Sequence, residues 1–375
     1  MQSYEESVAR LHNHIKLFHD ESREDFGEVY HSLGLALSKL GNYDESISSL
    51  NKALDMMTKV LGESHLSVAE TRLDLAKILE ECGNIDEAIG VYDHSITTLQ
   101  AASGVDSRVI ASAYSRLGTL FEEKGNVEAS LHSFKQALKM YSEISPGSES
   151  RAVAETLFNI GKIYDQMDNH DKATSCFSEC VKIFRSNDEE CAIIGIALGN
   201  VAKNYARKKQ FEKAVELSTE SLRLQKQFAE AGDIAQSLFD LAIILKSWGK
   251  ADQALQFFDE ALRTYEEAYG LDAIAVAICR HNIGIIKKTL GESEVALRYF
   301  GEALRIHRLN EGDNSLDVAN NLFQIGQIYD SFGKKEKSLK CFEECLKIRQ
   351  DILGVEHLEV LAAQRYLAKA MKYNN

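Results

Sequence analysis

Proline is almost absent from this chain, which has one, Pro146, in 375 residues. Because proline removes a backbone donor and breaks helices, so low a content favours an all-helical chain. Long apolar runs are missing too: no segment approaches the roughly 18 apolar residues that span a bilayer. The first residues are mixed and charged, without the apolar core of a signal peptide. We therefore expect a cytoplasmic protein with no membrane insertion.

An excess of positive charge is also lacking, since the formal net charge is -14. Nucleic-acid binding depends on basic surfaces that displace counterions, so this balance argues against nucleic acid as a partner. The sequence has no phosphate-binding loop, no Gly-x-Ser-x-Gly elbow and no metalloprotease helix motif. We predict that the protein is not an enzyme and has no cofactor.

The seven cysteines are odd in number and scattered among apolar residues, which favours a reducing compartment over a disulfide framework. Cys176 and Cys180 are four residues apart, as are Cys341 and Cys345. A structural zinc site needs four ligands, and neither pair has nearby histidines in sequence to complete one. We interpret these cysteines as packing residues and predict no metal.

What the sequence does contain is a repeat. A small residue follows an apolar one in segments such as SLGLAL, DLAKIL and RLGTLF, and it recurs every 40–43 residues. Regular self-similarity at such a period is the signature of a helical-repeat protein. We call this small residue the reference position, and it is occupied by Gly34, Ala76, Gly118, Gly161, Ala202, Ala242, Gly284, Gly326 and Ala368.

Other positions keep the same register. The residues 12 and 19 positions after the reference position are always small. The residue 16 positions after it is aromatic in six of eight repeats, with Leu50 and Ser218 as the exceptions. Small residues let two helices approach closely, and the aromatic ring fills the space beside them. The six aromatic residues are Tyr92, Phe134, Phe177, Phe258, Phe300 and Phe342.

A glycine usually stands seven residues after the reference position, where it can adopt the left-handed conformation that ends a helix. Asp168 and Lys209 replace it in two repeats. The spacing thus predicts a first helix, a short turn and a second helix in each repeat. The six glycines are Gly41, Gly83, Gly125, Gly249, Gly291 and Gly333.

One helix pair cannot bury its own apolar face, so successive pairs must stack. We therefore expect residues 1–375 to form a single solenoid. Residues 1–20 read as a half-repeat helix, residues 21–356 as eight helix-pair repeats, and residues 357–375 as a terminal helix.

The Leu-Gly pair, the later small residues and the aromatic resemble the tetratricopeptide repeat. The long loop strings, such as VLGESHLSVAETRLDLA, resemble the form of about 42 residues found in kinesin light chains. The resemblance implies an all-α fold, a right-handed superhelical solenoid of antiparallel helix pairs with eight full repeats and a half-repeat at each end. It also implies that the first helices line the concave side.

The positions two before and one after the reference position share a helix face. In repeats two to five they carry basic and amide side chains, which can bind carboxylates and peptide backbone. In kinesin-light-chain-like repeats, asparagines at the two-before position line a peptide groove, and the resemblance adds Asn282 to the set. The predicted peptide-binding residues are Lys77, Arg116, Asn159, Lys162, Asn200, Lys203 and Asn282.

Another interpretation of this face is that its polar residues are ordinary solvated side chains. The acidic residues that lie along the same helices can pair with the lysines; they are Asp74, Asp165, Asp240, Glu80 and Glu122. The site prediction and this alternative both stay open at the level of sequence.

Three functions fit the pattern. The first is an adaptor or scaffold that binds an extended, acidic protein segment in its groove, as a kinesin-light-chain-like cargo adaptor does. The second is the sensor region of a larger signalling ATPase or enzyme. The third is a structural solenoid that self-associates through its unpaired end helices.

Overall fold

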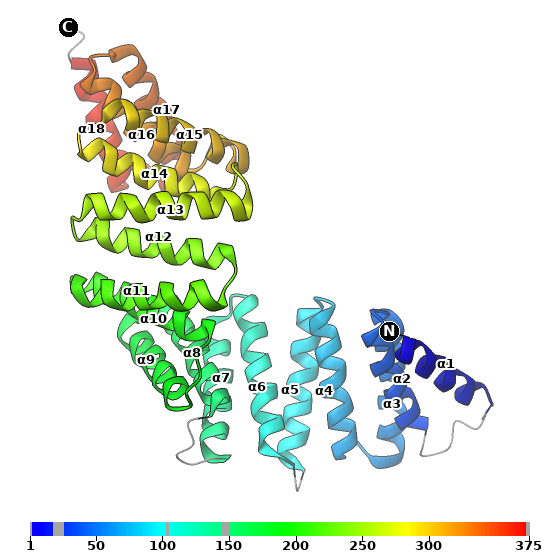
Figure 1. The fold of residues 1–375 in the computed structure, drawn as a ribbon. Coiled ribbons are helices and arrows are strands. Elements are labelled where there is room, and N and C mark those ends of the chain that lie inside the picture. The colour runs from blue at the N-terminus through cyan, green and yellow to red at the C-terminus, as the bar shows by residue number, and fades with distance from the viewer. Residues whose placement is uncertain (1, 18–25, 103–104, 145–149, 373–375) are drawn as a thin grey trace. The chain divides into compact units, whose positions relative to one another are not determined.

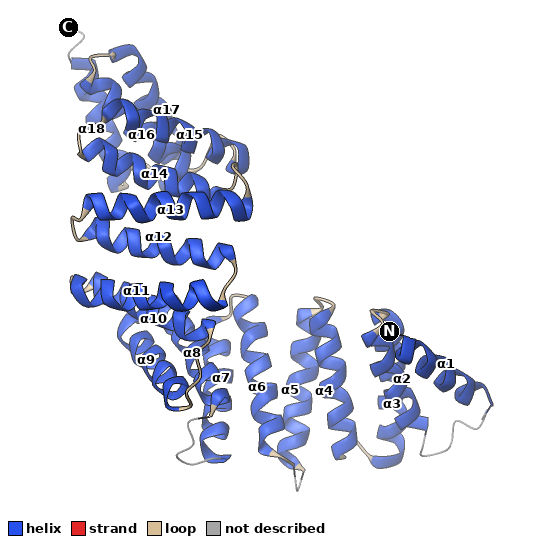
Figure 2. Cartoon of the chain, in the orientation of Figure 1, coloured by secondary structure: helices blue, strands red, loops and turns tan. Residues whose placement is uncertain are grey.

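The computed structural model describes residues 2–17, 26–102, 105–144 and 150–372. Within these ranges every regular element is an α-helix and none is a strand (Figure 2). This confirms the all-α fold class. None of the helices described is long and apolar enough to cross a membrane.

The chain divides into two compact units, Met1–Asp188 and Glu189–Asn375. In the first unit, α1 stands alone and is followed by four antiparallel helix pairs (Figure 1). Its helices are α1 Gln2–Leu17, α2 Phe26–Lys39, α3 Tyr43–Leu61, α4 Leu66–Glu81, α5 Ile85–Ala101, α6 Ser107–Glu123, α7 Val127–Ile144, α8 Arg151–Gln166 and α9 His170–Ser186.

In the second unit the four helix pairs come first, and a single helix follows them at the C-terminal end (Figure 1). Its helices are α10 Ala192–Arg207, α11 Phe211–Phe228, α12 Ala231–Ser247, α13 Ala251–Tyr269, α14 Ile274–Thr289, α15 Ser293–Glu311, α16 Leu316–Ser331, α17 Lys335–Leu353 and α18 Leu358–Lys372.

The first helix of each pair ends as the sequence predicts. All six glycines seven residues after the reference position have positive φ angles, for example +80° at Gly41 and +82° at Gly249. Asp168 and Lys209 adopt the same left-handed conformation, with φ of 54° and 60°. The chain therefore needs the turn even where it does not have glycine.

Small residues bring the two helices of a pair together. The residues 12 positions after the reference position are completely buried, and three of them are serines. The hydroxyls of Ser46, Ser130 and Ser338 donate to the carbonyl oxygens of the reference glycines 12 residues earlier, at 2.6, 2.7 and 3.0 Å. Aromatic rings pack against two of these glycines, Gly118 and Gly326: a Cβ added to Gly118 would lie 2.9 Å from the Phe134 ring.

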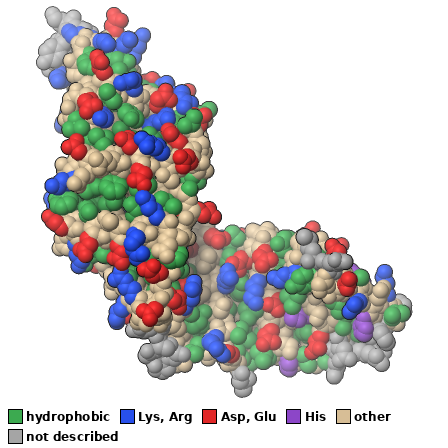
Figure 3. All heavy atoms as spheres, in the orientation of Figure 1, with side chains coloured by type: hydrophobic (Ala, Val, Ile, Leu, Met, Phe, Trp, Pro, Cys, Tyr) green, Lys and Arg blue, Asp and Glu red, His purple; other side chains and the backbone are tan. Residues whose placement is uncertain are grey.

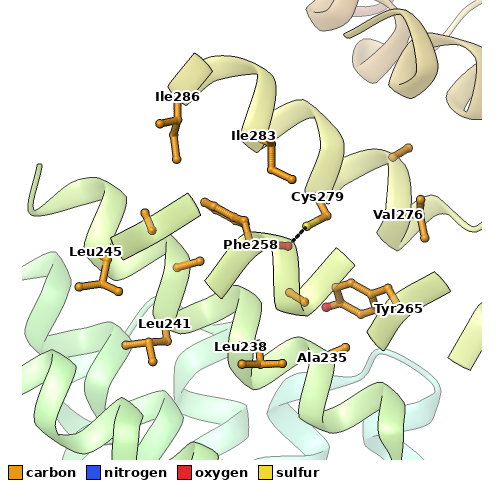
Figure 4. Close-up of a cluster of buried hydrophobic side chains, with 14 of the residues drawn as sticks. Ala235, Leu238, Leu241, Leu245, Phe258, Tyr265, Val276, Cys279, Ile283 and Ile286 are labelled. Carbon is orange, nitrogen blue, oxygen red and sulfur yellow. Dashed lines mark hydrogen bonds between the residues drawn. The ribbon is translucent and has the colours of Figure 1, made fainter. Parts of the chain in front are cut away.

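The core of each unit consists of clusters of buried side chains between first and second helices. Figure 4 shows part of it in the second unit, where Phe258 of α13 lies between side chains of α12 and α14. Cys279 Sγ donates to the Phe258 carbonyl oxygen at 3.3 Å. Cys180 and Cys345 are likewise fully buried, in agreement with a packing role.

The predicted repeat boundaries can be compared with the helix bounds, but they stay a prediction. Helix α1 accounts for residues 2–17 of the expected half-repeat, and residues 18–20 lie outside the described ranges, as does Pro146. The eight pairs and the terminal helix follow in order. The expectation of one solenoid through residues 1–375 stays a prediction, since the contacts divide the chain into two units.

Candidate functional site

The first helices of the two units carry the predicted site residues on their polar face. These helices are α2, α4, α6 and α8 in the first unit and α10, α12, α14 and α16 in the second. A side chain from one first helix meets a side chain from the next one in most repeats. On the face seen in Figure 3, acidic and basic side chains are interspersed over both units, without a large area of one sign.

The predicted cations each contact a carboxylate. Lys77 contacts a residue of its own helix, and the other three reach a neighbouring first helix. Acidic residues of these helices thus pair with the cations, which leaves the peptide-binding prediction open. The nitrogen–oxygen distances are 2.9 Å for Lys77–Asp74, 3.2 Å for Arg116–Glu80, 2.9 Å for Lys162–Glu122 and 2.9 Å for Lys203–Asp240.

Asp74 is the most heavily engaged of these carboxylates. It accepts hydrogen bonds from Lys77 and from His31 Nε2, the latter at 3.0 Å across α2 and α4. Burial by itself would raise the pKa of Asp74, but the hydrogen bonds from His31 and Lys77 hold that pKa below its ordinary value. The carboxylate therefore stays charged and links the two helices.

The first unit brings three of the predicted residues to neighbouring hollows. Lys77 and Arg116 line one hollow of about 340 Å³, between α4, α5 and α6. Arg116 and Asn159 line a second hollow of about 340 Å³, which is mostly polar. Asn159 makes no side-chain hydrogen bond in the described part of the chain, and the buried Ser115 Oγ beside it also lacks a partner. This hollow thus contains polar groups that a ligand can satisfy.

The second unit has a smaller hollow of about 160 Å³ between α10, α11 and α12. Asn200 and Lys203 line it together with Ser218 and Gln225. Ser218 occupies the position where most repeats have an aromatic ring, so the space that a ring fills elsewhere is open here. Gln225 is 2% exposed, and its Oε1 has no hydrogen-bond partner among the described residues.

Asn282 differs from the other two asparagines. It is buried, its Nδ2 donates to the Ile278 carbonyl oxygen at 2.9 Å, and its Oδ1 accepts from Lys246 Nζ at 2.6 Å. Both ends of the amide are therefore occupied. The structure places Asn282 in a contact between α12 and α14, apart from the hollow that contains Asn200.

Two lysines that sequence reasoning did not select lie on the same face. Lys246 and Lys288 stand four residues after the reference position, on α12 and α14. Their ammonium groups contact only neutral amides: Lys246 bonds to Asn282, and Lys288 bonds to Gln324 and Gln327. The sequence carries a signal for them, because the residue at this position is acidic in Glu80, Glu122 and Asp330 and basic in Lys246 and Lys288.

One group of residues has the composition of a metal site. His307, Glu311 and Asp317 have ligand atoms that all lie within 4.8 Å of one another, where α15 meets α16. Two of the three are exposed carboxylates, and His307 Nδ1 already lies 3.3 Å from Glu311 Oε1. We assign no metal to this group.

Stacked helix pairs with a polar first-helix face define a helical-repeat protein. The tetratricopeptide repeat model matches residues 25–101, 109–186, 193–267, 249–309 and 275–351. These matches cover most of the sequence. The chain belongs to the tetratricopeptide repeat family and is a repeat scaffold for protein interaction.

Solved structures agree with this fold at low sequence identity. A signal transduction ATPase with a tetratricopeptide repeat sensor, from Pyrococcus horikoshii, has a TM-score of 0.63 and 15% identity, covering 94% of this chain and 50% of its own. The apo form of RapI has a TM-score of 0.58 and 14% identity, covering 76% of this chain and 98% of its own.

BtubC (BKLC) from P. vanneervenii has a TM-score of 0.50 and 19% identity, covering 61% of this chain and 92% of its own. Identities this low establish the fold alone. No curated protein sequence matches the chain.

Proposed function

We propose that this protein is a cytoplasmic scaffold that binds an extended, acidic segment of a partner protein along its first helices. The residues proposed to contact the peptide are Lys77, Arg116, Asn159 and Lys162 in the first unit and Asn200, Lys203 and Asn282 in the second. The protein acts by binding, without catalysis and without a cofactor.

The hollow at Asn200 carries this proposal. An asparagine side chain can donate to and accept from a peptide backbone at the same time. Asn200 makes no side-chain hydrogen bond in the described residues, and the nearby Gln225 Oε1 is buried without a partner. A peptide amide that enters the hollow supplies the missing donor, so binding removes the cost of an unsatisfied buried group.

The ion pairs on the first helices fit reversible binding of an acidic segment. Lys203 and Asp240 are 39% and 19% exposed, so the lysine stays accessible while its carboxylate partner is largely covered. Pairs this open to solvent contribute about 1 kcal/mol or less to stability. A peptide carboxylate can therefore share or replace the internal partner at small cost.

The repeat length supports a finer proposal. Repeats of about 42 residues are typical of kinesin-light-chain-like adaptors, so we propose that the bound segment belongs to a cargo protein. A pull-down from native cell extract, read by mass spectrometry, identifies the partner. Recovery of transport cargo agrees with the proposal, whereas recovery of chaperones or no specific protein argues against it.

The binding class itself is tested with two fluorescein-labelled peptides, hexaglutamate and hexaglutamine. Anisotropy titrations should show tighter binding of hexaglutamate, with a preference that weakens as ionic strength rises. Equal affinities for the two peptides, or a preference that does not depend on salt, would contradict an acidic ligand.

A second candidate function is the sensor region of a larger signalling ATPase. It is favoured by the extent of the match to the Pyrococcus horikoshii protein, in which this chain corresponds to about half of the length. Reading the gene on both sides of this sequence distinguishes the candidates. An adjacent phosphate-binding loop supports the sensor, and an open reading frame without one supports the scaffold.

A further inference from the structure

At five junctions between first helices, the residue four positions after the reference position makes the same kind of contact. Its side chain contacts the residue two before or one after the reference position of the next first helix. Glu80, Glu122 and Asp330 make this contact with acidic side chains, and each meets a cation on the next first helix. Charge is therefore balanced across these three junctions.

At two successive junctions of the second unit, a lysine makes this contact instead of an acidic residue. Here the position is occupied by Lys246 on α12 and Lys288 on α14. Lys246 Nζ bonds to Asn282 Oδ1 at 2.6 Å, and Lys288 Nζ bonds to Gln324 Oε1 at 2.8 Å and also to Gln327 Oε1. In the residues described, neither ammonium contacts a carboxylate.

Both lysines are half-buried, and burial lowers the pKa of each below that of an ordinary lysine. A partly desolvated charge without a counter-charge is unfavourable, whereas a neutral amide oxygen compensates it only in part. The two positions thus hold positive charge that the fold does not neutralise, on a protein whose net charge is -14.

The lysines and the two glutamines have hydrogen-bond donors that the fold does not use. An ammonium has three N–H donors, so Lys246 has two left and Lys288 one left after their contacts with the amides. The Nε2 atoms of Gln324 and Gln327 donate to no other group in the described chain. Unused donors with uncompensated positive charge match the chemistry of a carboxylate, which only accepts.

We propose that Lys246 and Lys288, with Gln324 and Gln327, form the subsite that selects acidic residues in the peptide ligand. This inference rests on the proposed function and moves its charge selectivity to α12, α14 and α16. An extended peptide presents alternate side chains on one face, roughly 7 Å apart. Such a peptide can place acidic side chains on the face that carries the two lysines. The cations of the earlier repeats already have internal partners and contribute less to selectivity.

The test uses the full chain, the labelled hexaglutamate and hexaglutamine peptides, and two double variants of equal charge. Lys246→Met with Lys288→Met removes the proposed subsite and keeps most of the aliphatic stem. Lys340→Met with Lys347→Met removes two exposed lysines of α17 that have no contact in the described residues. We expect about tenfold weaker hexaglutamate binding in the first variant only.

The results separate this inference from the function on which it rests. If the wild-type chain does not prefer hexaglutamate over hexaglutamine, both the acidic ligand and the subsite are wrong. If it does, but the variant at residues 246 and 288 keeps that preference, only the subsite is wrong. Melting curves of both variants show whether the fold is intact.

A second measurement does not depend on any variant. Lysines with lowered pKa values react readily with an acetylating reagent near pH 8, and mass spectrometry reports each site. Hexaglutamate should slow acetylation of Lys246 and Lys288 and leave that of Lys340 unchanged. Equal rates with and without the peptide would overturn the assignment.

Discussion

Lys209 has a left-handed backbone conformation that a side chain of its kind disfavours. It ends the first helix of its pair with a φ angle of 60°, in the region where other repeats have glycine. Side chains with a Cβ atom pay roughly 1–2 kcal/mol in this region, and aspartate pays less because its side chain can bond locally. The fold therefore imposes the turn on Lys209 and accommodates it more easily at Asp168.

Lys209→Gly should stabilise the protein by about 1 kcal/mol, because it removes this strain. Asp168→Gly should give a smaller gain. Both are measured as shifts of the urea unfolding midpoint. The control is Lys208→Gly, which replaces a residue with φ of -80° and should be destabilising. A loss of stability in Lys209→Gly would show that the lysine side chain contributes more than the strain costs.

Two lysines of the first helices differ in their partners, since Lys162 pairs with a carboxylate and Lys246 with a neutral amide. Replacing each by methionine compares what the two contacts contribute to stability. Lys162→Met leaves the carboxylate of Glu122, whose side chain is 16% exposed, without its cation and should destabilise the protein by about 1 kcal/mol. Lys246→Met removes a half-buried cation without an anionic partner but leaves Asn282 Oδ1 without its donor, so the two effects offset and the loss should be smaller. Thermal melting checks both. A larger loss in Lys246→Met than in Lys162→Met would contradict the difference in pairing.

At the scale of elements, the helix pair is the unit that could be predicted from sequence. Its reference position, its turn and its aromatic residue depend on local spacing, and each was found where expected. The hollow at Ser218 could also be anticipated, since a serine replaces a ring there. Contacts between successive first helices were harder to predict from the sequence. They join residues about 40 positions apart, and they depend on which rotamer each side chain adopts. For that reason the neutral partners of Lys246 and Lys288 became visible only in the structure.

Ser218→Phe tests the link between the missing ring and the hollow. The new ring should occupy the space beside Asn200, as Phe258 does in the next pair, and keep or raise stability. Binding of hexaglutamate should weaken several-fold because the peptide loses the hollow. Anisotropy and melting measure the two effects. Unchanged affinity in a variant with an intact fold would show that the peptide does not bind in this hollow.

The junction of α2 and α4 should show a specific dependence on pH. The pKa of Asp74 is lowered in the folded chain, so its contribution is complete above the unfolded value near 3.9 and is lost as pH falls through the lower folded value. Asp74→Asn should be less stable than wild type at neutral pH, and the difference should shrink below about pH 4. Melting temperatures across this range give the difference. If the difference in melting temperature between wild type and Asp74→Asn stays constant with pH, the charge on Asp74 does not stabilise the junction.

On the scale of the whole molecule, each helix pair presents a few polar side chains on its first helix. In the function proposed above, binding affinity accumulates from these side chains within each unit and does not depend on one deep pocket. Changes in single residues then tune local charge without disturbing the core, which lies between the first and second helices. The switch from acidic residues to Lys246 and Lys288 is such a change.

The most direct measurement of the central claim is the position of a bound peptide. Hexaglutamate that carries a photo-crosslinking group should attach to the first helices, with the strongest signal on α12, α14 and α16. Mass spectrometry of the crosslinked chain locates the attachment sites. Attachment mainly to the second helices, such as α11, α13 and α15, would contradict a ligand surface built from first helices.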